Sequence, residues 1–158
     1  MEDRLLEHET DCPCGSGAHY GHCCAVFHEG KPAPTAETLM RSRYSAYVLG
    51  LNEYLQNTWH ASTRPNKLIL QSDDPIMWTR LEIVRTEKGE PNDKLGIVEF
   101  MAHYSVGDKS GYLHETSNFV KEENHWYYFD GEIEYHDDDI QEDFKDFKPI
   151  RRRLSVEP

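Results

Sequence analysis

The sequence predicts an α+β protein in which a short metal-binding segment precedes helices packed on a curved antiparallel sheet. All four cysteines fall between residues 12 and 24. After residue 35, apolar side chains recur at helical spacing, and from residue 77 onward they alternate with polar ones as in strands. A chain of 158 residues is long enough for one or two small domains.

The cysteines are the most specific signal. They form the string C-P-C-G-S-G-A-H-Y-G-H-C-C, in which Pro13 restricts the backbone and Gly15 and Gly17 permit a tight turn. A C-x-C pair followed by C-C can bring four thiolates together on one borderline-soft ion such as Zn²⁺. The predicted ligands are Cys12, Cys14, Cys23 and Cys24, with His22 as an alternative to one of them.

Four protein ligands leave no coordination position for a reactive water, so the predicted zinc is structural. Its binding could supply about 10–16 kcal/mol to order a segment with few apolar residues. Disulfides and free or redox-active thiols are the alternatives. The opening residues lack a basic flank and an apolar stretch, so we expect a cytoplasmic protein, and disulfides are rare in that compartment.

The rest of the chain predicts a linker, two helices and four strands. The prolines of residues 31–34 indicate a linker, and Thr35 and Gly50 are suited to cap the two ends of a first helix. Its expected buried stripe is Met40, Tyr44, Tyr47 and Leu51. A second helix is expected over 52–59, and strands over 77–86, 95–106, 112–121 and 126–133. We expect three parts: a zinc-binding segment with linker (1–33), a helix-and-sheet domain (34–135) and a C-terminal extension (136–158).

Charge and hydropathy exclude two classes of partner. The net charge of −12 opposes binding to a phosphate backbone, and the basic triplet at 151–153 is too short to reverse that, so no nucleic-acid partner is expected. No apolar run approaches the ~18 residues needed to cross a bilayer, so no membrane insertion is expected. The extension carries Ile140, Phe144, Phe147 and Ile150 at near-helical spacing, which suits docking on its own domain or on a partner.

Several motifs resemble a known family. The pattern C-P-C-G-S-G-x-x-Y-x-x-C-C resembles the SEC-C motif, the zinc knuckle also found at the C-terminus of the SecA translocase, with Cys24 where SecA has histidine. The segments T-A-E-T-L-M-R-S-R-Y-S-A-Y (35–47), T-W-H-A-S-T-R-P (58–65) and G-Y-L-H-E-T-S-N-F-V (111–120) are similar to the bacterial YchJ-like family. The resemblance implies a domain like nuclear transport factor 2, a cone of helices and curved sheet that can enclose a pocket. The family has no established biochemical activity.

Enzymes on such a cone place acids, histidines and aromatic residues in the pocket. His114 with a tyrosine could transfer a proton there, but ordinary core and rim residues are the leading interpretation of these side chains. We see no glycine-rich phosphate loop and no nucleophile elbow in the sequence, so catalysis is not the leading expectation. The pocket candidates are Trp59, His60, His103, Tyr104, Tyr112, His114, Glu115 and Trp126.

Arg41, Arg43 and Arg64 are candidates for an anion or carboxylate site at the mouth of the cone, because guanidinium groups bind such ligands bidentately. Structural pairing with acids of the sheet is the leading expectation for these arginines, and the anion site is the alternative. The leading functional hypothesis is a zinc-dependent protein-interaction module that presents a surface near His19, Tyr20 and His22 and binds a protein partner or forms a homodimer. The rival is a ligand-binding or enzymatic pocket with a purely structural knuckle.

Overall fold

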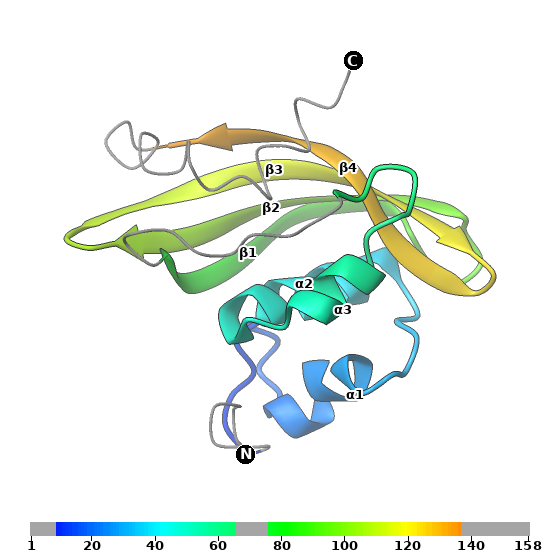
Figure 1. Cartoon of the computed structure of the whole chain (residues 1–158), viewed down its shortest axis with the longest axis horizontal. Helices are drawn as coiled ribbons and strands as arrows, with labels where there is room; N and C mark the ends of the chain where they lie inside the picture. Colours follow the sequence, from blue (N-terminus) through cyan, green and yellow to red (C-terminus); the bar gives the residue numbers. More distant parts are fainter. Residues whose placement is uncertain (1–8, 66–75, 137–158) are drawn as a thin grey trace.

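The computed structural model describes residues 9–65 and 76–136, in which three layers are stacked: a cysteine-rich knuckle, a pair of helices and a long curved sheet (Figure 1). The predicted fold class is confirmed. The expectations for residues 1–8 and for the apolar positions after 136 lie outside the described residues. The elements are η2 (Tyr20–His22), α1 (Cys24–His28), α2 (Ala36–Leu49), α3 (Asn52–Asn57), β1 (Ile76–Lys88), β2 (Leu95–Val106), β3 (Lys109–Glu122) and β4 (His125–Tyr135).

Helix α2 is the middle layer, and both of its predicted caps are confirmed. The Thr35 side chain accepts a hydrogen bond from the backbone N–H of Thr38, and Gly50 takes a left-handed conformation at φ 74°. The predicted buried stripe was too narrow. Met40 and Tyr44 are buried, but so are Ser42, Arg43, Ser45 and Ala46, because α2 is covered by the sheet on one side and by the knuckle on the other.

Two glycines let the start of α2 approach the β1–β2 hairpin. The backbone N–H of Ala36 donates to the carbonyl of Gly89 over 2.9 Å. A Cβ on Gly89 would lie 2.8 Å from the Cβ of Ala36, and one on Gly96 would lie 2.6 Å from the Cα of Gly89. Any larger residue at these positions would therefore push the helix away from the sheet.

The four strands form an antiparallel meander in the order β1-β2-β3-β4. Burial alternates along β2, with Val98, Phe100, Ala102 and Tyr104 on the covered inner face, as the sequence predicts. The register of β3 with β4 shifts between Asn118 and Phe119, which adds a bulge to β4 where the sheet curves. The strands thus present one face to the helices and one outward.

The segment after α3 is hydrogen-bonded to the free edge of β4. The Tyr128 N–H donates to the carbonyl of Thr58, and the His60 N–H donates to the carbonyl of Tyr128, each over 2.8 Å. Trp59 lies between them with its ring perpendicular to that of Tyr128. Within the part of the chain that the structure describes, no helix is both long and apolar enough to span a bilayer.

Candidate metal centre and inner pocket

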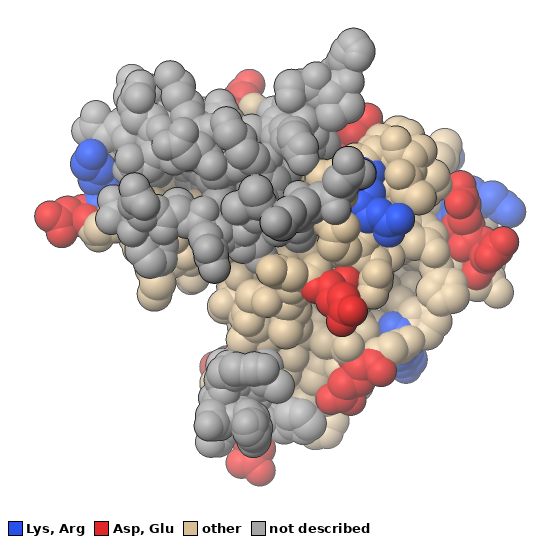
Figure 2. Space-filling view, in the orientation of Figure 1, with Lys and Arg blue, Asp and Glu red and all other residues tan. Residues whose placement is uncertain are grey.

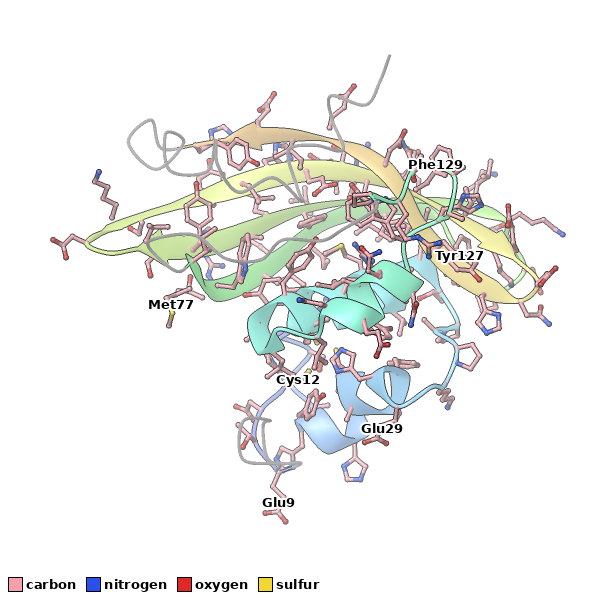
Figure 3. All side chains as sticks on the ribbon, in the orientation of Figure 1. Glu9, Cys12, Glu29, Met77, Tyr127 and Phe129 are labelled. Carbon is pink, nitrogen blue, oxygen red and sulfur yellow. The ribbon has the colours of Figure 1, made fainter. Side chains whose placement is uncertain are left out.

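The four cysteines converge on one point beneath α2 (Figure 3, where Cys12 is labelled). Their Sγ atoms all lie within 4.8 Å of one another, and those of Cys14 and Cys23 are 3.6 Å apart. Tetrahedral Zn–S bonds would place neighbouring sulfurs about 3.8 Å apart. The cysteines form no disulfide, and all but Cys23 are buried. The quartet therefore fits a closed metal site; His22 is exposed and outside this cluster.

A tight backbone turn holds the first two ligands. The Cys12 N–H donates to the carbonyl of Ala18, and the Gly15 N–H donates to the carbonyl of Cys12. Gly15 and Gly17 adopt φ values of 80° and 92°, which residues with a side chain rarely reach. The glycines of the motif are thus required by the turn that aims Cys12 and Cys14 at the cluster.

Helix α2 supplies the second layer of contacts to the sulfurs. The hydroxyl of Ser45, which is fully buried, donates to the Sγ of Cys24 over 3.3 Å and lies 3.6 Å from that of Cys12. Arg41 Nη1 donates to the carbonyl of Cys14 over 2.8 Å. A hydroxyl donor and a guanidinium close to the cluster stabilise negative charge on thiolates. The knuckle is therefore fastened to the helix-and-sheet domain through the site itself.

The thiols also interact with one another. Hydrogen bonds from Cys14 and Cys24 lower the pKa of Cys12 far below its usual range. The same hydrogen bonds, together with burial, raise the pKa of Cys14 and of Cys24. A cation that binds all four as thiolates has to displace protons, so its affinity falls as the pH falls.

A histidine that the sequence did not single out joins α1 to α2. His28 Nε2 donates to the carbonyl of Ser42 over 2.8 Å, so in the neutral ring Nδ1 is the acceptor, 2.7 Å from the hydroxyl of Tyr20. Burial lowers the pKa of His28, which favours this neutral form. Tyr20, expected on the surface, is only 5% exposed. A tyrosine and a histidine eight residues apart carry no sequence signal for such a contact.

A second concave feature lies between α2 and the inner face of the sheet. This pocket has an empty volume of about 500 Å³ when its open mouth is included. Its apolar lining is mostly aromatic, with Met40, Ala102 and Leu113 beside Tyr44, Tyr47, Trp59, Trp78, Phe100 and Tyr128. Its polar lining consists of Arg43, Glu115 and Ser117, all buried.

The two charged residues of this inner pocket are each held by neighbours. Arg43 donates to the carbonyl of Leu55 and to the hydroxyl of Thr58, and its Cζ lies 4.8 Å from the ring centroid of Tyr128. Burial lowers the pKa of Arg43. The Tyr128 hydroxyl donates to Glu115 Oε2 over 2.7 Å. The pocket thus contains one cation and one carboxylate, both already engaged.

Unlike the side chains of Arg43 and Glu115, two other polar side chains of the pocket lack hydrogen bonds within residues 9–65 and 76–136. Trp59 Nε1 and Ser117 Oγ are buried and have no hydrogen-bond partner among the described residues. An unpaired buried donor costs about 1–3 kcal/mol. Both residues line the inner pocket, so a molecule in it could satisfy them.

The residues that the sequence suggested for the pocket lie at several different places in the structure. Trp59 and Glu115 line the inner pocket, and Tyr104 is buried against Trp78 on the same face. Strand alternation places Tyr112 and His114 on the opposite, outer face, where His103 also lies, so they do not belong to this pocket.

The remaining pocket candidates, His60 and Trp126, lie near the start of β4. His60 Nε2 is 2.9 Å from Glu122 Oε2, and Trp126 Nε1 donates to the carbonyl of Pro34. The candidate arginines bind carbonyl groups in different places: Arg41 that of Cys14, Arg43 that of Leu55, and Arg64 that of Gln56.

The four-cysteine knuckle followed by helices on a curved sheet defines the class: a SEC-C motif joined to a domain like nuclear transport factor 2. Residues 35–131, more than half of the chain, match the family profile described as "YchJ, middle NTF2-like domain". The chain belongs to the YchJ-like family, which confirms the resemblance drawn from its motifs.

Relatives and solved structures agree with this assignment. A UPF0225 protein of Chromobacterium violaceum is 50% identical over 76% of this chain and 90% of its own length, and one of Corynebacterium glutamicum is 46% identical over 78% and 97%. The solution structure of a SEC-C motif containing protein from Rhodopseudomonas palustris has a TM-score of 0.65 at 30% identity and covers 77% of this chain and 96% of that one. The crystal structure of another from Psychrobacter arcticus has a TM-score of 0.64 at 28% identity and covers 80% and 84%.

Proposed function

We propose that the four cysteines hold one structural Zn²⁺ and that the knuckle it orders is a docking surface for a protein partner. The observation that carries this is the convergence of Cys12, Cys14, Cys23 and Cys24 within 4.8 Å on a site backed by α2. Four sulfur ligands favour zinc and leave no position for a reactive water. A closed site of this kind acts through the shape that it imposes on its surroundings.

The surface that the metal would shape is the turn between the ligand pairs. Ser16, Gly17, His19 and His22 are exposed there, whereas Tyr20 belongs to the interior. Acidic side chains are scattered over the visible face of the helices and the knuckle (Figure 2). We therefore expect the partner to present a neutral or basic surface.

The test is affinity capture with matched variants. His19→Glu/His22→Glu changes the exposed turn and leaves the four ligands in place, and His125→Glu on the β3–β4 turn is the control. Proteins retained by the zinc-loaded chain and by the control, but lost with the turn variant and with chelator, would support the docking surface. Retention of every protein by the turn variant would refute it.

The inner pocket supports a second candidate function, the binding of a small aromatic or planar molecule. The observation in its favour is the pair of unpartnered atoms, Trp59 Nε1 and Ser117 Oγ, in an aromatic lining. Ligand-detected NMR with indole and benzoate probes would test it, with Ser117→Val as the variant. Binding that weakens in this variant supports the pocket, and no binding of either probe argues against it.

The proposal extends to the cellular location of the protein and to its oligomeric state. Four reduced thiols without a disulfide suit a reducing compartment, which supports a cytoplasmic location. The net charge of −12 argues against nucleic acid as the partner. A homodimer remains part of the proposal, and sedimentation or light scattering of the zinc-loaded chain would measure it.

A further inference from the structure

The outer face of the sheet gathers histidine and carboxylate side chains from three strands. His114 on β3 is directly opposite Glu134 on β4, so both project from the same face. His136 follows Glu134 by two residues, and its backbone N–H donates to the carbonyl of Tyr112. This register places both imidazoles beside one carboxylate.

The donor atoms of this outer-face cluster are close enough to share an ion. One ligand atom each from His114, Glu134 and His136 lies within 4.8 Å of the other two, and His136 Nε2 is 3.6 Å from Glu134 Oε1. Tetrahedral bonds of ordinary Zn–N and Zn–O length put neighbouring donors about 3.4 Å apart. Small side-chain rotations on an exposed surface would close the difference.

On β2, Glu99 borders this cluster and is hydrogen-bonded to one of its histidines. Glu99 Oε2 lies 2.6 Å from His114 Nε2, while its other oxygen accepts a hydrogen bond from Arg85 Nε over 2.7 Å. Arg85 thereby orients Glu99 toward the histidine, as outer partners orient ligands in metal sites.

The second histidine is also held in place. The ring of Tyr112 stacks on that of His136, with centroids 4.6 Å apart and planes 14° apart. Stacking reduces the rotamer freedom that His136, although exposed, would lose on binding an ion. The cluster is therefore partly organised without a metal.

We propose that His114, Glu134 and His136 bind one divalent transition-metal ion at the outer face, with Glu99 holding the His114 ring in place. Two imidazoles with a carboxylate suit Zn²⁺, Ni²⁺ or Cu²⁺, whereas Mg²⁺ and Ca²⁺ prefer oxygen ligands alone. The site is exposed, so water completes the coordination and the ion exchanges readily. Such a site is separate from the cysteine cluster in position, ligand type and access.

The experiment is calorimetric titration of Ni²⁺ into the full chain, without an affinity tag, whose cysteine site has first been filled with Zn²⁺. We expect one binding event of one equivalent. His114→Ala and His136→Ala should each weaken it at least tenfold, and His125→Ala, which removes an exposed histidine from the β3–β4 turn, should leave it unchanged.

A parallel measurement locates the ion. Cu²⁺ added to the zinc-loaded chain should broaden the NMR signals of His114 and His136 before those of His125. The proposal is overturned if no binding event follows saturation of the cysteines, if both alanine variants bind as the parent does, or if His125→Ala weakens binding equally. Unchanged thermal unfolding of the variants would show that any loss is not a loss of fold.

Discussion

The cysteine cluster and the outer-face cluster are two candidate metal sites built in opposite ways. The cysteines lie within thirteen consecutive residues, and three of the four are buried against α2. The outer-face donors come from β3, from β4 and from the residue after β4, and lie at the surface of a sheet that the hydrogen-bonded strands already hold together. An ion at the first site would shape the chain, whereas an ion at the second would bind to a chain already folded.

This difference has a thermodynamic consequence. Ligands that converge only when the chain folds link metal binding to folding, so removing one of them destabilises the structure. Ligands on a preformed surface couple weakly to stability, because the strands stay paired when the ion leaves. The variants below separate the two cases by their effect on unfolding.

The largest effect is expected for Cys14→Ser. Loss of one of four sulfur ligands at a fully buried position should release zinc and unfold the knuckle, at a cost of at least ~3 kcal/mol in the free energy of unfolding. Metal analysis and the amide NMR signals of residues 9–30 would measure this. His22→Ala is the matched control and should keep one zinc per chain; loss of zinc in that variant would make His22 a ligand.

The second-largest effect on the free energy of unfolding is expected for His28→Ala. This variant removes a contact between the knuckle and α2 that does not involve the metal ligands. The variant removes the hydrogen bonds that His28 makes with the Tyr20 hydroxyl and the Ser42 carbonyl, at a cost of about 2 kcal/mol. Zinc content should stay unchanged. Denaturant unfolding of the zinc-loaded chain measures the cost, and no destabilisation would show that the metal alone fastens the knuckle.

The same histidine predicts a pH dependence. Burial lowers the folded-state pKa of His28 below 6.5, so its neutral ring contributes stability that is present above pH 6.5 and is lost as the pH falls through the lowered folded-state pKa. Between pH 7 and pH 5 the parent should therefore lose more stability than His28→Gln. Parallel curves for the two proteins would contradict this.

A smaller effect on the free energy of unfolding is expected for Tyr128→Phe. This variant removes a buried hydrogen bond to a carboxylate, for comparison with the exposed carboxylate contacts on the outer face of the sheet. The hydroxyl donates to Glu115, a residue 5% exposed, and its loss should cost about 1 kcal/mol. A double-mutant cycle with Glu115→Gln would report the coupling between the two side chains. Zero coupling would show that Glu115 relies on its other contacts.

The smallest effect on stability is expected for His114→Ala. Its ring lies on the outer face and contacts an exposed ion-pair network, so the change in the free energy of unfolding should be under ~0.5 kcal/mol. The same variant should abolish the second metal-binding event. A destabilisation comparable to that of Cys14→Ser would contradict the idea that only the cysteine site is strongly linked to folding.

Local signals in the chain were sufficient for the knuckle, the caps of α2 and the alternation of β2. Each depends on residues close in sequence: the cysteine spacing, Thr35 before a helical run, and the period of two from Gly96 to Val106. The pocket assignment failed for Tyr112 and His114 because residue type does not say which face of a strand is covered. The structure places Trp59 and Glu115, two other candidates, in the lining of the inner pocket.

The sequence alone specified which residues could form a metal knuckle. Its four cysteines lie within thirteen residues, and the glycines between them permit the tight turn that brings the sulfurs together. Only the folded molecule decided that Tyr20 and His28 fasten this knuckle to α2, and that His114 meets Glu134 and His136. Those contacts depend on strand register and on which surfaces α2 covers. The strand register and the surfaces covered by α2 depend on which apolar residues, distant in sequence, become buried together. No short stretch of sequence determines that arrangement.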